Sequence, residues 1–458
     1  MFFQLPNCVK PHGSFDKERQ LSTLNPKSST LNLQPVTERL LQFIWQFQYF
    51  NKNELAAVSG GNVQIIFPGQ YNTNQGPDFT GARIKIDNTT WAGTVELHIR
   101  TSDWNKHEHQ TDSNYNNVIL HVVWENDTVA NNIPVIELKS RVSKILLQRY
   151  GELMNSSAFI ACEKSIHTVR DITWKSWKER LLAERLSRKA NTVETYLEQN
   201  NYHWEEIFWW LLARNFGMKV NADAFEAMAR SISLKILSKH KNQVHQIEAL
   251  LFGQAGLLEK NPNSYREEDD YLLLLRKEYD FLQAKYTIRP MHIPIHFLRM
   301  RPGNFPTVRL AQLAMLVYGS AHLFSKIKEA DSVKEIKRWL DVTANDYWHY
   351  HYRFDEISAF KKKKLGDTMI DNIIINTVVP VLFAYGNYHS EQKYKDKALQ
   401  WLEETAHENN SITKGFQKIG IENRNGFDSQ GLIELKTQYC DRKMCLECGV
   451  GNYLLKSI

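Results

Sequence analysis

The sequence predicts an α+β protein in which a mixed α/β domain is followed by a mainly helical domain. A chain of 458 residues exceeds what one hydrophobic core usually serves, so two domains are expected. Short alternating runs fill residues 62–124, whereas apolar residues recur with a helical period from about residue 168 onward. This change of period predicts an α/β domain at 37–150 and a helical domain at 151–458.

The composition is that of an ordinary soluble globular protein, with 42% hydrophobic and 24% charged residues. A formal net charge of +6 permits binding to a polyanion without requiring it. No run approaches the roughly 18 to 20 apolar residues that a membrane span needs, and the first residues lack the apolar centre of a secretory signal. We therefore expect a cytoplasmic protein without a membrane partner.

The elements of the first domain follow from its periodicity. Residues 1–36 are rich in Ser, Asn, Lys and Pro without a period, which predicts a mobile tail. Helical spacing over 37–50 then predicts an amphipathic helix capped by Thr37. Its apolar face would comprise Leu40, Leu41, Ile44, Trp45 and Phe47. Strands are expected at 62–67, 81–86, 91–100 and 118–124, between turns rich in Gly, Pro, Asn and Asp.

The second domain shows helical periodicity without a fixed-period repeat, so a solenoid is not predicted. The lysine run at 360–366 is interpreted as a solvated turn. Arg299, Arg301 and Arg309 flank an Asn-Phe-Pro turn, where pairing with neighbouring groups is favoured over phosphate contacts.

Carboxylates and basic side chains concentrate on the expected strands of the first domain. Asp78 follows Pro77 in a turn, and Glu96, His98 and Arg100 alternate along the strand at 91–100, so these three share one face. Two converging carboxylates suit Mg²⁺ or Mn²⁺, and a nearby basic group can orient an attacking water. The alternative is structural: Asp78 caps its turn and Glu96 pairs with Arg100.

The motifs GPDF at 76–79 and Glu96-Leu97-His98 resemble the core of the PD-(D/E)xK phosphodiesterase superfamily. The resemblance implies a restriction-endonuclease-like domain in which Asp78 and Glu96 bind the catalytic metal. Glu54, near the end of the helix at 37–50, stands where that superfamily sometimes has an additional acid. His98 stands where the superfamily has lysine. A histidine is neutral near pH 7 and can coordinate a metal instead, while Arg100 would supply the missing positive charge.

A second set of ligand types lies in the same region. His107, His109, Asp112 and His121, with His98 nearby, are the donors of a zinc or other transition-metal site. Exposure to solvent is the plain expectation for His107 and His109, and a hydrogen-bonded structural role is favoured for His121.

Three cysteines near the C-terminus, Cys440, Cys445 and Cys448, have the spacing C-x4-C-x2-C and suit zinc or an iron–sulfur cluster. Cys162 is the better candidate for a fourth ligand and Cys8 the worse one. Certain nucleases of the superfamily use a 4Fe–4S cluster with one cysteine before the core and three after it, an order that differs here because Cys162 follows the core. Reduced free thiols are the alternative, since five cysteines predict no disulfide framework.

Over residues 37–458 the chain also resembles an uncharacterised bacterial family, a domain of unknown function. The segments that carry this resemblance are 68–79, 91–109, 115–127, 247–258, 299–314, 375–386 and 439–451.

The favoured hypothesis for the function is metal-dependent hydrolysis of phosphodiester bonds in DNA or RNA. Asp78 and Glu96 would hold the metal, and His98 would assist as ligand or base. The alternatives are a nuclease-like interaction module without catalysis and a His-rich metallohydrolase that acts on small substrates.

Overall fold

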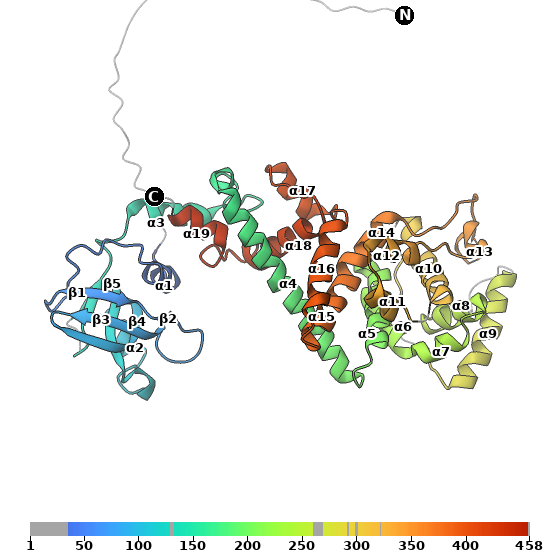
Figure 1. Cartoon of the computed structure of the whole chain (residues 1–458), viewed down its shortest axis with the longest axis horizontal. Coiled ribbons are helices and arrows are strands. Elements are labelled where there is room, and N and C mark those ends of the chain that lie inside the picture. Colours follow the sequence, from blue (N-terminus) through green and yellow to red (C-terminus); the bar gives the residue numbers. More distant parts are fainter. Residues whose placement is uncertain are drawn as a thin grey trace, which may run out of the picture.

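The computed structural model describes residues 35–128, 132–259, 269–290, 293–297, 301–320, 322–354 and 356–456. Cys8, Arg299 and nearly all of the expected tail lie outside these ranges. Figure 1 shows a sheet domain at one end of the molecule and a helical domain at the other, with the long helix α4 (Asp171–Gln199) running between them. The chain is thus mixed α/β at its N-terminal part and mainly helical afterwards.

The N-terminal domain is built around a curled six-stranded sheet with the order β1-β3-β4-β5-β6, in which β2 pairs with β3. The β1/β3 and β3/β4 pairs are antiparallel, whereas β4/β5 and β5/β6 are parallel. Its elements are α1 (Glu38–Gln46), β1 (Val63–Phe67), β2 (Gln70–Tyr71), β3 (Phe79–Ile86), β4 (Thr89–Arg100), α2 (Asp103–Lys106), η1 (Ser113–Tyr115), β5 (Val118–Glu125), β6 (Val135–Glu137) and α3 (Lys144–Asn155).

The first helix begins as predicted, because the Thr37 side chain accepts a hydrogen bond from the backbone N–H of Leu40 at 3.2 Å. Leu40, Leu41, Ile44 and Trp45 are buried against the sheet domain's core. Phe47 was wrongly placed on that face: the helix ends before it, and its side chain is 40% exposed. Phe43 fills the core instead.

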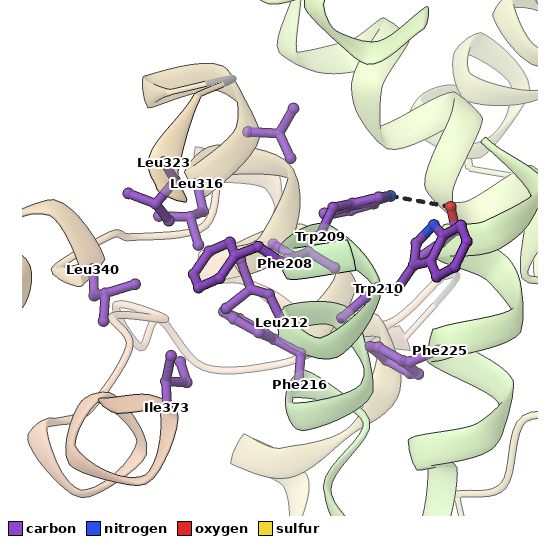
Figure 2. Packing of buried hydrophobic residues seen from close by; sticks show 14 of the residues in the cluster. Phe208, Trp209, Trp210, Leu212, Phe216, Phe225, Leu316, Leu323, Leu340 and Ile373 are labelled. Atoms are coloured by element: carbon purple, nitrogen blue, oxygen red, sulfur yellow. Dashed lines mark hydrogen bonds between the residues drawn. The ribbon is translucent and has the colours of Figure 1, made fainter. Parts of the chain in front are cut away.

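The helical domain has a single large core, to which α5 (Trp204–Phe216) contributes Phe208, Trp209, Trp210 and Phe216 (Figure 2). Phe208, Trp209 and Phe216 are nearly inaccessible. Trp209 satisfies its indole N–H by donating to the carbonyl of Ala229 at 3.1 Å.

The remaining elements of this domain and its flanks are η2 (Ile166–Thr168), α5 (Trp204–Phe216), α6 (Met218–Ser231), α7 (Leu234–Lys239), α8 (Val244–Gln254), α9 (Asp270–Tyr286), η3 (Pro302–Asn304), α10 (Pro306–Gly319), α11 (Leu323–Glu329), α12 (Val333–Leu340), α13 (Asp346–His349), β7 (His351–Arg353), β8 (Glu356–Ile357), α14 (Asp367–Ile373), η4 (Ile374–Val378), α15 (Val379–Tyr388), α16 (Gln392–Glu404), α17 (Ser411–Lys418), α18 (Gly426–Glu434), η5 (Leu435–Cys440) and α19 (Gly449–Lys456).

One helix of the described residues, Asp367–Tyr388, is long and apolar enough to cross a membrane by length and composition. It comprises α14, the π-helix η4 and α15, and 72% of its most apolar window is buried. This burial explains its composition, because a helix enclosed by other helices is apolar on all sides. The sequence analysis missed this run, which Asp371, Asn372 and Asn376 interrupt.

The C-terminal segment returns to the N-terminal domain. Figure 1 shows α19 beside α3, and Leu455 of α19 belongs to the buried core of the sheet domain. Tyr49 donates a hydrogen bond to Asn452 at 3.0 Å, and Arg149 donates to the carbonyl of Leu454 at 3.2 Å. Helix α19 also packs against α4, so it contacts the helical domain as well as the N-terminal domain.

Candidate metal centre

The antiparallel pairing of β3 with β4 brings Asp78 and Glu96 together. Asp78 precedes β3, and its backbone N–H donates to Glu96 Oε2 at 3.0 Å. Asp78 Oδ2 in turn accepts from the backbone N–H of Leu97 at 3.1 Å, and Oδ1 accepts from Gln42 of α1 at 2.7 Å. Both carboxylate oxygens of Asp78 therefore accept hydrogen bonds. No sequence pattern indicated that Gln42 contributes to this site.

Three histidines gather next to Glu96. Their ring nitrogens, one each from His98, His107 and His109, all lie within 4.8 Å of one another, so this triad could bind a metal. His98 Nε2 lies 3.1 Å from His107 Nδ1. Glu96 Oε1 lies 3.6 Å from His98 Nε2 and 3.5 Å from His109 Nε2. The face shared by Glu96 and His98 agrees with the alternation along β4.

A tight turn after α2 directs His107 and His109 to the same place. Glu108 between them has a φ of 59°, the left-handed conformation, which reverses the chain direction. Asp103 at the start of α2 anchors the turn by accepting from the backbone N–H of Arg100 at 3.0 Å. His107 is exposed, so the expected solvent contact holds for it, but the His109 side chain is only 11% exposed.

Aromatic rings enclose the inner side of the cluster. The Tyr115 ring stacks on the His109 ring with centroids 3.8 Å apart. Trp104 is buried and packs edge-on against His109. Asp112 caps η1 by accepting from the backbone N–H of Asn114 at 2.9 Å, so it supports the position of Tyr115. These contacts indicate that Asp112 positions Tyr115 beside the histidines.

His121 of β5 orients His98. The parallel register pairs Glu96 with His121, and His98 Nδ1 lies 2.9 Å from His121 Nε2. Burial lowers the pKa of His98 to about 2 and that of His121 to about 4, so both rings are neutral at pH 7. When His98 donates its Nδ1 proton to His121, its Nε2 lone pair faces His107 and Glu96. A partner on the far nitrogen is the usual support of a metal-binding histidine, which agrees with the structural role predicted for His121.

The donor set fits a metal ion. A tetrahedral ion with bonds of about 2.0–2.1 Å separates its ligand atoms by about 3.3 Å, close to the 3.1, 3.5 and 3.6 Å found here. His109 Nε2 is buried and makes no hydrogen bond. A buried polar nitrogen without a hydrogen bond is costly unless another partner binds it. Three nitrogens and one oxygen suit Zn²⁺ better than Mg²⁺, which prefers oxygen.

Ionising the carboxyl groups of Asp78 and Glu96 costs free energy, because both groups are buried. Burial raises the pKa of Asp78 to about 6, against the effect of its hydrogen bond from Leu97. Burial and the neighbouring Asp78 raise the pKa of Glu96 to about 9, and Glu38 of α1 raises both. Bound cations reverse this balance by favouring the carboxylate.

Replacing Glu96 by glutamine is expected to stabilise the metal-free protein at pH 8 by more than about 1.4 kcal/mol, the equivalent of one pKa unit. In the unfolded chain Glu96 ionises above its ordinary pKa of 4.5, whereas the folded chain holds it protonated up to about 9. The contribution of the protonated Glu96 side chain to the free energy of unfolding is therefore fully present below pH 4.5, and it is lost as the pH rises toward 9. Urea unfolding of metal-free protein at pH 4 and pH 8 measures the effect. The two proteins should differ at pH 8 alone, and an equal difference at both values would contradict the shifted pKa.

Two predicted site residues lie elsewhere. Arg100, at the exposed end of β4, interacts electrostatically with Glu125 and Asp127, so it does not replace the lysine of the motif. Arg100 is the last residue of β4 and pairs in register with Glu125 of β5, where it is exposed to solvent. Glu54 is exposed beyond α1, and the α1 acid that acts on Asp78 is Glu38.

The other predicted residues lie at two separate places. Arg309 is buried and donates to Gln312 at 2.9 Å and to Asn304 at 2.6 Å, a structural pairing as favoured from the sequence. Cys162, Cys440, Cys445 and Cys448 are free thiols between the domains, near α3 and α19.

Comparison with known proteins identifies the family without supplying an activity. No curated protein and no solved structure shows a detectable match to the chain. A family model described as "Protein of unknown function (DUF2851)" matches residues 38–411, which is most of the chain. The chain therefore belongs to the DUF2851 family of proteins of unknown function.

Proposed function

We propose that the protein is a metal-dependent hydrolase whose N-terminal centre binds a transition-metal ion through Glu96, His98, His107 and His109. The spacing of these donors carries the proposal, because three of the six separations among them approximate the edges of a tetrahedral site and the histidine nitrogens lie within 4.8 Å of one another. The buried His109 Nε2, which makes no hydrogen bond, also supports it.

The residues around such a centre would have different roles. Exposed His107 marks the side from which a substrate reaches the ion. His121 and Tyr115 hold the rings of His98 and His109, and Asp78 fixes Glu96 through its backbone N–H. A bound divalent ion would polarise the substrate and lower the pKa of a water molecule.

Phosphodiesters are the proposed substrate class, with DNA or RNA as the natural polymer. Asp78 and Glu96 are hydrogen-bonded neighbours, and the resemblance to the PD-(D/E)xK superfamily implies a metal-binding role for the same two residues. A histidine in place of the lysine of that motif agrees with a nitrogen-rich centre, for which Zn²⁺ or Mn²⁺ fits better than Mg²⁺. The net charge of +6 is compatible with a polyanion, and the free thiols are compatible with a reducing cytoplasm.

A hydrolysis assay tests this proposal. Metal-free protein is supplied with Zn²⁺, Mn²⁺ or Mg²⁺ and offered double-stranded DNA, single-stranded DNA, RNA and bis(p-nitrophenyl) phosphate. We expect cleavage with Zn²⁺ or Mn²⁺, and a loss of at least about 100-fold in Glu96→Ala, since one electrostatic contribution to catalysis is typically worth that much. An Arg100→Ala variant is the matched control, because that side chain lies away from the centre on the same strand.

The substrates separate the competing functions. Hydrolysis of the small diester with polymers left intact would support a small-substrate metallohydrolase. If a metal-loaded protein binds DNA or RNA with strong salt dependence but cleaves none of the four substrates, hydrolysis is ruled out and a non-catalytic interaction module remains.

A further inference from the structure

The four cysteines of the described chain meet where the two domains join. Cys162 lies in the connection after α3 and packs against the cores of both the sheet domain and the junction. Cys445 belongs to the sheet-domain core, and Cys448 to the small core formed with Trp177 of α4. Cys440 ends η5 and packs on that same junction. The thiols thus come from segments almost 300 residues apart.

The thiols are also close enough to influence one another. Cys440 interacts electrostatically with each of the other three, and Cys162 interacts with Cys445 and Cys448. Cys445 and Cys448 are buried, and all four are free of disulfide bonds. Four reduced thiols at one point, two of them buried and two partly buried, are more than packing by single cysteines accounts for.

The loop around Cys448 is shaped to receive a thiolate. Backbone N–H groups of Val450 and Gly451 donate hydrogen bonds to the Cys448 sulfur at the start of α19. Gly451 has no room for a side chain, since a Cβ there would lie 2.1 Å from the carbonyl oxygen of Cys445. A Cβ at Gly449 would lie 2.7 Å from the Trp177 ring. Donors aimed at a sulfur are a typical support of thiolate ligands.

We propose that Cys162, Cys440, Cys445 and Cys448 bind one soft metal centre, a zinc ion or an iron–sulfur cluster, which fastens the C-terminal segment to both domains. Thiolates are the ligands that these two centres share. The centre is separate from the histidine site and does not depend on the proposed hydrolysis.

The distances between the sulfur atoms help to distinguish a zinc ion from an iron–sulfur cluster. Within the described ranges, no three of these sulfurs all lie within 4.8 Å of one another, so the set as a whole is more widely spaced than the histidine triad. A single zinc ion with bonds of about 2.3 Å would draw four sulfurs to about 3.8 Å from one another. The wider spacing favours a cluster, whose several irons stand between the thiolates. A cavity of about 810 Å³ beside Cys162, bordered by α3 and α19, offers an entry path.

The test begins with the unmodified full-length protein, purified under reducing, oxygen-free conditions. Zinc, iron and acid-labile sulfide are measured per chain, together with the visible absorption of iron–sulfur clusters. A mercurial reagent is then titrated against the thiols while released metal is followed with an indicator. Because Cys8 is not a proposed ligand, we expect one of the five thiols to react without releasing metal and the release to accompany reaction of the other four. Five reactive thiols with neither zinc, iron nor sulfide would overturn the proposal.

Single variants identify the ligands. Each of the variants Cys162→Ser, Cys440→Ser, Cys445→Ser and Cys448→Ser should lower the metal content of the centre at least tenfold, whereas Cys8→Ser should leave it unchanged. The His107→Ala/His109→Ala protein serves as a second background, because it should keep the thiolate-bound metal. If Cys162→Ser keeps its metal and Cys8→Ser loses it, the assignment of the fourth ligand is overturned. The thiol titration of unmodified protein remains decisive if a variant does not fold.

Discussion

A protein in which His107 and His109 are both replaced by alanine is expected to bind no metal at the N-terminal centre and to hydrolyse no phosphodiester above background. The two substitutions remove two of four donors and leave Glu96 and His98, which form one edge of the tetrahedron. Removing even a supporting partner of a metal ligand typically costs about 10–100-fold in affinity, so we expect a loss of more than about 100-fold. Zinc titration of metal-free protein measures it directly.

His167→Ala provides a matched control for that experiment. His167 is an exposed histidine in η2, outside the N-terminal domain, and its replacement should leave affinity and hydrolysis unchanged. Asp78→Ala distinguishes the two predicted ligand sets. Metal retained by the double histidine variant but lost from Asp78→Ala would show that the carboxylate pair, and not the triad, holds the ion.

Local periodicity predicted much of the N-terminal domain. The Thr37 cap, the strands and the shared face of Glu96 and His98 each depend on residues close in sequence. The pairing of β4 with β5 is parallel and places His121 beside Glu96. No local pattern specifies that pairing, because a parallel neighbour is reached by a crossover and its register is set by packing.

The features of the candidate centre that the sequence did not predict also depend on structure that no local pattern specifies. His107 and His109 were named as metal ligands, yet exposure was the plain expectation for both. Their convergence depends on the left-handed Glu108, an uncommon conformation for a residue other than glycine. Gln42 reaches Asp78 from a helix 36 residues earlier, and its sequence neighbourhood carries no polar signal beyond an ordinary helix surface. Alternation also placed Arg100 on this strand, but Arg100 lies at its exposed end and interacts electrostatically with Glu125 and Asp127.

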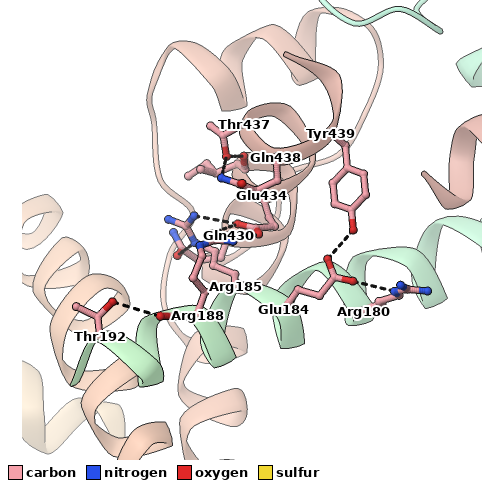
Figure 3. Close-up of polar contacts among 11 residues, drawn as sticks. Arg180, Glu184, Arg185, Arg188, Thr192, Gln430, Glu434, Thr437, Gln438 and Tyr439 are labelled. Carbon is pink, nitrogen blue, oxygen red and sulfur yellow. Dashed lines mark hydrogen bonds and ion pairs between the residues drawn. The ribbon is translucent and has the colours of Figure 1, made fainter. Parts of the chain in front are cut away.

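Replacing Glu434 by alanine is expected to lower the free energy of unfolding by about 3–5 kcal/mol, the usual cost of leaving a buried charge without its partner. Glu434 of α18 is 1% exposed and accepts from two nitrogens of Arg188 on α4, at 2.5 and 2.6 Å. It also accepts from Arg185 at 3.4 Å, as Figure 3 shows. The Arg185 side chain is 14% exposed; burial lowers its pKa, and Glu434 acts in the opposite direction.

Glu184→Ala is the matched control on the same pair of helices. Glu184 pairs with Arg180 at 2.8 Å and accepts from Tyr439 at 2.7 Å, but it is 33% exposed (Figure 3). Water replaces such partners, so the loss should not exceed about 1 kcal/mol. Urea unfolding followed by tryptophan fluorescence compares the two variants. Equal losses would mean that the buried carboxylate contributes no more than a surface pair, and that apolar packing alone holds α18 against α4. A large loss for Glu434→Ala would instead show that the end of the chain is held to α4 by charge, next to the point where the cysteines meet.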